Sequence, residues 1–322
     1  MEIFSNSFSI RRHFYMLHEV IIAHELSITQ KQVLTTLGLL DEGATVPFIS
    51  RYRKELTGSL DEVQITAIRD RAQQLRELDK RKEAVLKSIG DQGKLTAELE
   101  VAVRAADTMS ILEDIYLPYK PKRKTRASIA REKGLQPLAE SLLAQSSTDV
   151  EATALAFVNT ELGVKNTEEA LAGARDIIAE TIAEDAEVRA LVRKIFVDKG
   201  KFVSRLIPGK EEAGQKYKDY FEWSESLKTA PSHRVLAMRR GEKEELLYLD
   251  IEVDEDTVIP KIDSLYIKGK NEAAKQVELA LFDGYKRLLK PSMETEIRVL
   301  TRQRADEEAI KVFADNVRQL LL

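Results

Sequence analysis

The sequence of 322 residues contains no cysteine, only one tryptophan and four histidines. The lack of cysteine excludes disulfide bonds and thiolate metal sites, and it is typical of a protein of the cytoplasm. Three of the histidines, His13, His18 and His24, lie near one another without forming the HExxH pattern of zinc peptidases. We therefore expect no metal site and no cofactor.

Long apolar runs and enzyme motifs are missing as well. No stretch approaches the ~18 apolar residues of a membrane-spanning helix, and the first residues do not resemble a signal peptide. The sequence has no GxSxG nucleophile motif and no dinucleotide-binding fingerprint, and Gly209 and Lys210 lack the other residues of a phosphate-binding loop. Carboxylates alternate with Lys and Arg at helical spacing, which is typical of solvated ion pairs. We predict a cytoplasmic protein that is not an enzyme and does not contact a membrane.

The composition and the spacing of apolar residues predict a mainly α fold. Hydrophobic residues make up 43% of the chain and charged residues 32%, a balance typical of amphipathic helices around a core. We expect a multi-helical N-terminal region, a helix-turn-helix-like subdomain and one small β-hairpin.

One short segment is basic, although the chain as a whole is acidic. Residues 115–134 carry seven basic side chains and one acidic side chain, in a chain whose net charge is −4. We call residues 115–134 the basic segment. Pro118 and Pro121 favour an ordered, non-helical connector within it. Its candidate nucleic-acid-binding residues are Lys120, Lys122, Arg123, Lys124 and Arg126.

Two interpretations of the basic segment stay open. Tyr116 and Tyr119 lie beside the cations, so their rings could stack bases while the cations bind phosphates. The alternative is a solvated loop whose Lys and Arg stems cover apolar surface.

Residues 1–124 are predicted to form an N-terminal helical region that ends in the basic segment. Pro47 begins a short basic helix, and a capping box of Ser59 and Glu62 begins a long strut helix that extends to about Gly90.

Within the short basic helix, Arg51 is expected to pair with Glu55 while Arg53 points elsewhere. For Arg51 and Arg53 we favour a packing or domain-docking role over contact with nucleic acid.

Residues 125–200 are predicted to form a compact helical subdomain. Helices at Ser128–Lys133 and Pro137–Ala144, with Gly134 between them, have the spacing of a helix-turn-helix. Further helices follow from Asn166 as far as Gly200.

Residues 201–322 are predicted to contain one β-hairpin and two long helices. The strands are expected at Arg234–Arg239 and Glu245–Val253, with His233 at the start of the first strand and Trp223 at the entry to the hairpin.

The two long helices are expected at Asn271–Leu289 and Pro291–Leu322. The second ends on Leu320, Leu321 and Leu322, and we expect these leucines either to be exposed, for want of a partner, or to be buried in a neighbouring copy.

Several of these segments resemble the Tex family of bacterial transcription accessory proteins. The matching motifs are EGATVPFISRYRKELTG at 42–58, LDEVQ at 60–64, ILEDIYLPYKPKRKTRASIAREKGLQPLAE at 111–140 and HRVLAMRRGE at 233–242. The resemblance begins near Met16, so the preceding residues are either an extension or lie before the natural start of translation.

The resemblance implies the N-terminal half of a longer protein. It implies a helical region with a helix-turn-helix-like domain, which continues in the family into an RNase H-like domain, helix-hairpin-helix repeats and an OB-fold RNA-binding domain. The sequence ends where the RNase H-like domain would begin.

Two functions follow from these observations. The first is a non-enzymatic scaffold of a transcription accessory protein, which contacts the transcription machinery and binds RNA or single-stranded nucleic acid through the basic segment. The alternative is a protein-interaction module, whose basic segment docks the transcription machinery or the missing C-terminal domains. A nuclease ranks third, because that activity would need the RNase H-like domain.

Overall fold

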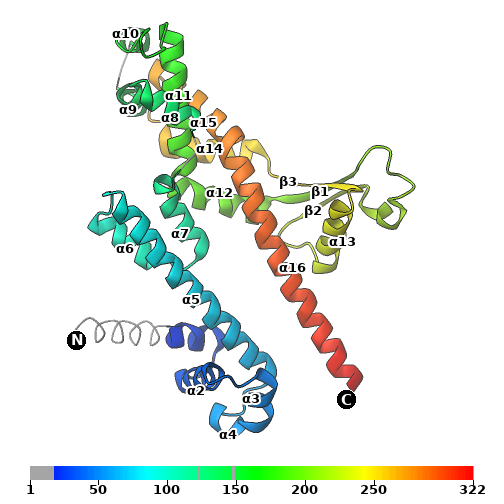
Figure 1. Ribbon diagram of the computed structural model, residues 1–322. Coiled ribbons are helices and arrows are strands. Elements are labelled where there is room, and N and C mark those ends of the chain that lie inside the picture. The colour runs from blue at the N-terminus through cyan, green and yellow to red at the C-terminus, as the bar shows by residue number, and fades with distance from the viewer. Residues whose placement is uncertain (1–17, 122–123, 147–148, 322) are drawn as a thin grey trace, which may run out of the picture. The chain divides into compact units, whose positions relative to one another are not determined.

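The computed structural model describes residues 18–121, 124–146 and 149–321, and it confirms a mainly α-helical fold. The chain divides into two compact units, Met1–Leu112 and Glu113–Leu322, which we call the N-terminal and C-terminal units and describe separately (Figure 1). The domain boundaries expected at residues 124 and 200 stay a prediction.

The N-terminal unit packs short helices against the first half of a long one (Figure 1). A helix at residues 18–26 is followed by α2 (Gln30–Asp41), α3 (Val46–Tyr52), α4 (Lys54–Thr57), α5 (Glu62–Asp91) and α6 (Ala97–Ala105). Ile22, Val33, Ile49 and Ile65 are fully buried between them. Because the helix at residues 18–26, α2, α3 and α5 each contribute apolar side chains, the unit has its own hydrophobic core.

The long helix α5 begins with a capping box two residues later than predicted. The Asp61 carboxylate accepts a hydrogen bond from the Gln64 N–H at 2.8 Å, and the Gln64 side chain accepts one from the Asp61 N–H at 3.1 Å. The box predicted at Ser59 and Glu62 is wrong, because Ser59 has a φ of 63° and an N-cap residue needs extended backbone.

The pair expected between Arg51 and Glu55 is also wrong. Helix α3 ends at Tyr52, and Arg53, with φ −131° and ψ 25°, interrupts the helix before α4. The spacing of four residues therefore does not bring Arg51 and Glu55 together, and no ion pair joins them.

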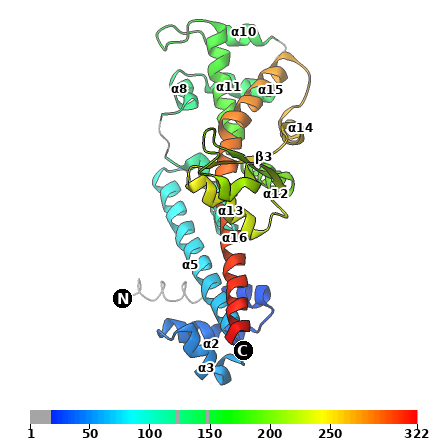
Figure 2. The same ribbon diagram turned by 90° about the vertical axis from the view of Figure 1, so that its right-hand side faces the viewer.

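Helix α11 is the central element of the C-terminal unit. Helices α8, α9 and α15 pack against it, and α11 and α15 lie side by side in Figures 1 and 2. The helices of this unit are α7 (Met109–Tyr116, which begins before the boundary), η1 (Leu117–Tyr119), α8 (Arg126–Glu132), α9 (Gln136–Ala144), α10 (Val150–Leu155), α11 (Thr167–Glu184), α12 (Ala186–Lys199), η2 (Gln215–Tyr220), α13 (Ser232–Lys243), α14 (Glu255–Tyr266), α15 (Glu272–Gly284), the π-helix η3 (Tyr285–Leu289) and α16 (Lys290–Leu321).

A three-stranded antiparallel sheet interrupts these helices. Its strands are β1 (Lys201–Leu206), β2 (Glu222–Ser226) and β3 (Leu247–Glu252), in the order β2-β1-β3. Phe202 of β1 and Leu249 and Ile251 of β3 are buried on one face of the sheet. Helix α13 packs against β3, and this contact covers the apolar side of the strand (Figure 1).

The predicted hairpin is therefore corrected. The strand expected at Arg234–Arg239 is part of helix α13, which buries Val235 and Met238 one helical turn apart. The strand expected at Glu245–Val253 is confirmed as β3, but it pairs with β1 instead of with the preceding segment. Trp223 lies in β2, where the Arg234 guanidinium sits 5.3 Å from the centroid of its ring.

The two long C-terminal helices are confirmed as α15 with η3 and as α16. Leu320 is 85% exposed near the end of α16, and Leu322 lies outside the described residues. Helix α14, which contains Pro260, was not predicted. Within the described ranges, no helix combines the length and the apolar character that crossing a bilayer requires.

Candidate nucleic-acid interface

A buried ionic network holds the N-terminal end of the basic segment. Asp114 of α7 accepts hydrogen bonds from Arg189 Nε and from Arg193 Nη2 of α12, each at 2.5 Å. Arg193 Nε also donates to Glu296 of α16 at 2.5 Å. Because charged side chains in a core must be paired, this network fixes α7 against α12 and α16.

Burial removes one of the two aromatic residues from the candidate interface. Tyr116 is only 7% exposed, so the hypothesis that its ring stacks a base is wrong. Tyr119, in η1, is half-buried. The apolar end of the segment therefore belongs to the core of the unit, and the cations begin where the chain leaves that core.

Three of the five predicted cations lie within the described residues, and all three are exposed: Lys120, Lys124 and Arg126. Lys122 and Arg123 lie outside the described residues. Lys124 pairs with Glu132 at 3.2 Å, and both side chains are more than half exposed. Such a pair contributes little to stability, so Lys124 can exchange its partner for a phosphate at small cost.

A capping box fixes the C-terminal end of the loop. The Thr125 hydroxyl accepts a hydrogen bond from the Ser128 N–H at 3.0 Å, and Ser128 Oγ accepts one from the Thr125 N–H at 2.8 Å. Helix α8 therefore begins at Arg126, earlier than the predicted start at Ser128, and Arg126 lies in its first turn.

An open groove of about 450 Å³ lies beside the start of α8. Arg126, Lys133 and Lys165 line it together with two carboxylates, Glu169 and Asp176. Burial raises the pKa of Asp176, although the charges of Arg287 and Arg126 oppose that shift. The groove is therefore lined by three cations and two acidic side chains, so its surface is not uniformly basic.

Two of these cations were not among the predicted site residues. Lys133 belongs to the basic segment, and its Nζ donates to the Gly163 carbonyl at 2.9 Å. Lys165 lies far along the chain, and only the packing of α11 brings it to the groove. Nothing in the sequence around Lys165 indicates that this residue lies at the groove.

The close approach of the turn between α8 and α9 to α11 depends on a glycine. A Cβ atom on Gly173 would lie 2.3 Å from Leu135 Cδ1 and 3.4 Å from the Ala130 Cβ. Both Leu135 and Gly173 line the groove. The width of the groove is therefore set by the absence of a side chain at position 173.

Helices α8 and α9 form the helix pair that the sequence predicts, with the turn at Gly134. In a helix-turn-helix the second helix reads the DNA groove. Glu140 is the one charged residue of α9, and Arg131 of α8 is bound to Glu180 at 2.6 Å. The second helix therefore presents no cation to a phosphate backbone.

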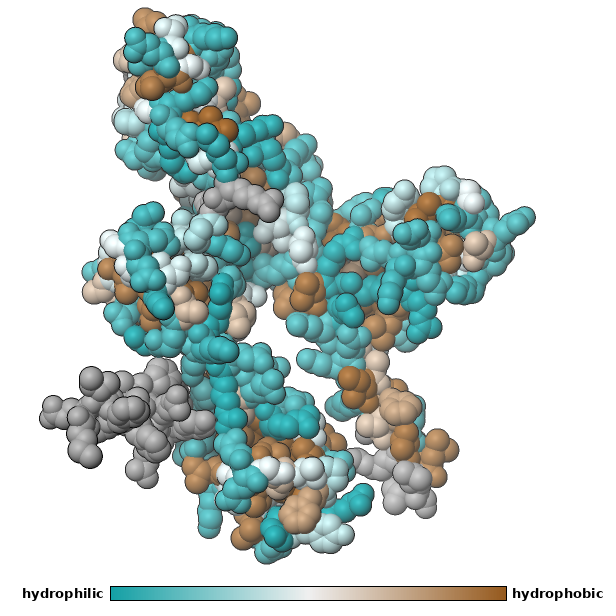
Figure 3. Space-filling model, in the orientation of Figure 1, coloured by the Kyte–Doolittle hydropathy of each residue, from teal (hydrophilic) through white to brown (hydrophobic). Residues whose placement is uncertain are grey.

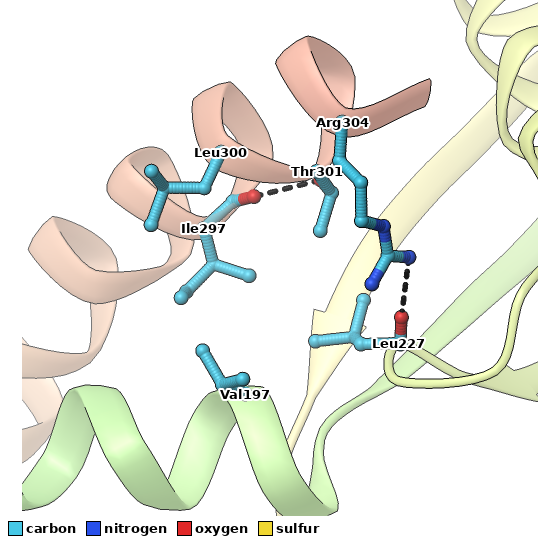
Figure 4. Close-up of a pocket in the computed structure, with 6 residues that line it drawn as sticks. All are labelled: Val197, Leu227, Ile297, Leu300, Thr301 and Arg304. Atoms are coloured by element: carbon cyan, nitrogen blue, oxygen red, sulfur yellow. Dashed lines mark hydrogen bonds between the residues drawn. The ribbon is translucent and has the colours of Figure 1, made fainter. Parts of the chain in front are cut away.

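A smaller cavity of about 180 Å³ lies between α12, α16 and the end of β2 (Figure 4). Its lining is apolar apart from Thr301 and Arg304. Both side chains bond to the backbone, Thr301 to Ile297 and Arg304 to Leu227, each at 2.7 Å. This cavity does not suit a polyanion.

Among the residues that the structure describes, no cluster of three or more His, Asp or Glu side chains could hold a metal ion.

These features define a mainly helical protein with clustered cations on an otherwise acidic chain. A family model described as Tex-like protein N-terminal domain matches residues 16–90, and one described as Tex central region-like matches residues 145–313. The chain belongs to the Tex family, which confirms the resemblance found in the sequence. The basic segment lies between the two matched regions.

Curated relatives agree with this assignment. The chain is 42% identical over 314 residues to the Transcriptional accessory protein Tex of Neisseria gonorrhoeae and 40% identical over 316 residues to Protein tex of Bordetella pertussis. It is 28% identical over 300 residues to the S1 RNA-binding domain-containing protein 1 of Homo sapiens. These alignments cover 94%, 94% and 88% of this chain but only 40%, 40% and 30% of the relatives.

Proposed function

We propose that this chain is a non-enzymatic, cytoplasmic scaffold of a transcription accessory protein and that its basic segment binds RNA or other single-stranded nucleic acid. The observation that carries the proposal is the exposure of Lys120, Lys124 and Arg126, which follow the anchoring ion pairs of Asp114 and adjoin the capping box of Thr125. Two relatives support its class: one is named a transcriptional accessory protein, and the other is named for an S1 RNA-binding domain.

The binding that we expect is electrostatic and local. The chain has a net charge of −4, so the basic segment attracts a polyanion only locally, within roughly a Debye length of ~8 Å at physiological salt. Each phosphate that a cation neutralises releases condensed counterions, which makes the affinity fall steeply with salt. Single strands are favoured over duplex DNA, because α9 offers no cation to a DNA groove.

The groove extends this surface beyond the loop. Arg126 belongs to the basic segment and also lines the groove. Lys133, after the end of α8, and Lys165, before the start of α11, add two further cations to the lining. A strand that leaves the loop can therefore keep its phosphates near cations. Glu169 and Asp176 limit the attraction, so the affinity should be no better than non-specific binding, about 10⁻⁴ to 10⁻⁶ M.

The test is the triple substitution of Lys122, Arg123 and Lys124 by alanine in the full chain. The slope of log affinity against log salt should decrease by up to about two for single strands and about three for duplex. A matched control replaces three exposed lysines elsewhere in the C-terminal unit, Lys194, Lys199 and Lys201, and should leave the slope near its parental value. An unchanged slope in the first variant, or an equal loss in the control, would contradict the proposal.

A protein-interaction role is the second candidate. It is favoured by the exposed apolar side chains along the C-terminal part of α16, which include Phe313 and Leu320. The partner would be the transcription machinery or the further domains that the longer relatives contain. This candidate replaces the first if the triple variant binds nucleic acid as the parent does but loses stability or a protein contact.

A further inference from the structure

Two aromatic side chains point to solvent from the N-terminal unit. Tyr52 is 63% exposed and Phe48 is 40% exposed, and both belong to α3. Their ring centroids are 5.5 Å apart and the rings are inclined by 41°. Figure 3 shows brown and tan side chains among teal ones on the surface of the part that carries α2, α3 and α4. Large apolar rings in such a position need a reason, because burying them would stabilise the fold.

The spacing of buried residues in α3 leaves these rings outside the core. Val46, Ile49 and Ser50 are buried, at positions three and four apart, and they form the inner face of the helix. Phe48 and Tyr52, also four apart, form a separate face. The core of the unit is therefore complete without either ring.

Cations surround the two rings. The Arg53 guanidinium carbon lies 5.0 Å from the centroid of the Phe48 ring, and Arg53 Nη1 donates to the Tyr52 carbonyl at 3.0 Å. Arg51 and Lys54 are exposed and form no ion pair with any described residue. We call Phe48, Arg51, Tyr52, Arg53 and Lys54 the aromatic-cation surface.

Although the sequence favoured a packing or domain-docking role for Arg51 and Arg53, we propose that the aromatic-cation surface is a binding site for single-stranded nucleic acid. A base stacks on the exposed ring of Tyr52, the Arg53 guanidinium over Phe48 extends the stacking platform, and Arg51 and Lys54 bind the flanking phosphates. Aromatic rings with adjacent free cations are the combination by which proteins hold single strands without sequence preference.

Nucleic acid fits this surface better than an acidic peptide does. An amphipathic helix binds by laying several apolar side chains into an apolar groove. On α3, the exposed large hydrophobic side chains are the two aromatic rings, and the Arg53 guanidinium lies over one of them. Flat rings that alternate with cations match the alternation of bases and phosphates along a strand.

The site shares no residue with the basic segment and belongs to the other compact unit. The inference is therefore independent of the function proposed above. The two sites also differ in kind: the basic segment acts by charge, whereas the aromatic-cation surface acts mainly by stacking.

The experiment uses the full chain and labelled oligo(U), oligo(dT), a blunt duplex and an acidic amphipathic peptide. Tyr52→Leu keeps an apolar side chain but removes the aromatic face, and Tyr52→Phe keeps the face. We expect Tyr52→Leu to weaken binding of both single strands about 5- to 150-fold without changing the salt slope, and Tyr52→Phe to stay within about twofold of the parent. Binding of the duplex should change little.

Two further variants make the result specific. Tyr248→Leu removes another exposed tyrosine, on β3 in the C-terminal unit, and should leave binding unchanged. Replacing Arg51 and Lys54 by alanine should lower the single-strand salt slope by up to about 1.4. The triple basic-segment variant should change the salt slope, whereas Tyr52→Leu should not. The two proposed sites can therefore be tested, and contradicted, independently. The proposal is overturned if Tyr52→Leu binds both strands as the parent does, or if only peptide binding is lost. If one strand alone is affected, the site is assigned to RNA or to DNA accordingly.

Discussion

Arg189 and Asp114 form an ion pair inside the C-terminal unit, with Arg189 Nε 2.5 Å from Asp114 Oδ1 and side chains that are 8% and 5% exposed. The pair joins α12 to the last turns of α7, directly before the basic segment. Ion pairs in such positions specify which helices meet, because each charge is unfavourable in the core without the other.

Arg189→Met should destabilise the C-terminal unit by about 3–5 kcal/mol, because Asp114 keeps only one of its two cations. Urea unfolding followed by the fluorescence of Trp223, which lies in this unit, measures the loss. Arg205→Met is the control: Arg205 pairs with Glu252 on the exposed side of the sheet, and its loss should cost far less than the loss of Arg189. Equal stability of the two variants would show that the buried pair is not structural.

Gly284→Ala should destabilise the same unit by about 1–3 kcal/mol, although alanine is the better helix former. A Cβ atom at this position would lie 2.8 Å from the carbonyl oxygen of Ala179 and 3.1 Å from its Cα, so α15 would have to move away from α11.

Gly38→Ala is the matched control, because a Cβ atom there meets nothing within 4 Å and the residue lies in α2. This variant should gain up to about 1 kcal/mol. Thermal unfolding by circular dichroism compares the two substitutions, and a gain at both positions would argue against a tight contact between α11 and α15.

Asp263→Asn should stabilise the protein at neutral pH by about 0.5 kcal/mol. Burial raises the pKa of Asp263, the charge of Glu278 adds to the shift, and Oδ1 of Asp263 is buried without a hydrogen bond. The folded state therefore binds the proton more tightly than the unfolded state, and stability falls as the pH rises from 3.8 through the raised pKa.

The advantage of Asp263→Asn should accordingly disappear when the pH falls below 3.8. Urea unfolding at a series of pH values measures it. Asp256→Asn, in the first turn of the same helix α14, should instead lower stability slightly. A negative charge at this position stabilises the helix by its attraction to the positive end of the helix dipole, and the substitution removes it. A pH-independent effect at Asp263 would show that the carboxylate is not the cause.

Glu132→Gln should strengthen nucleic-acid binding by roughly 1.5- to 5-fold, since it frees Lys124 from a surface ion pair and removes a negative charge from the basic segment. Fluorescence anisotropy with a labelled single strand measures the change. Glu151→Gln, at an exposed position of α10, changes the net charge equally and should have no effect. A similar gain in both variants would indicate a general effect of net charge.

The sequence predicted β3 and the long helices because their apolar residues recur at the periods of strand and helix. It did not predict β1, since Ser204 occupies an inward position that an apolar residue would mark. The Ser204 hydroxyl is fully buried there and donates to the Tyr220 carbonyl at 2.7 Å. The segment of α13 was assigned to a strand because a short apolar run fits either structure, and only its contact with β3 and α16 decides between them.

The candidate site was predictable only in part. A cluster of cations can be recognised directly from the sequence. The burial of Tyr116 and the approach of Lys165 to Arg126, in contrast, depend on contacts between residues that are distant in the sequence. The exposure of Tyr52 has the same origin, because the core that forms beneath α3 leaves its ring outside.

The glycine at position 173 separates two properties of the groove that usually change together. Its charges come from Arg126, Lys133 and Lys165, but its width comes from a position that carries no functional group at all. A substitution at position 173 would therefore change the width of the groove and leave its three cationic side chains in the sequence. Under the function proposed above, a relative with a larger residue at this position would keep the cations that attract phosphates and differ in the width of the groove that receives the strand.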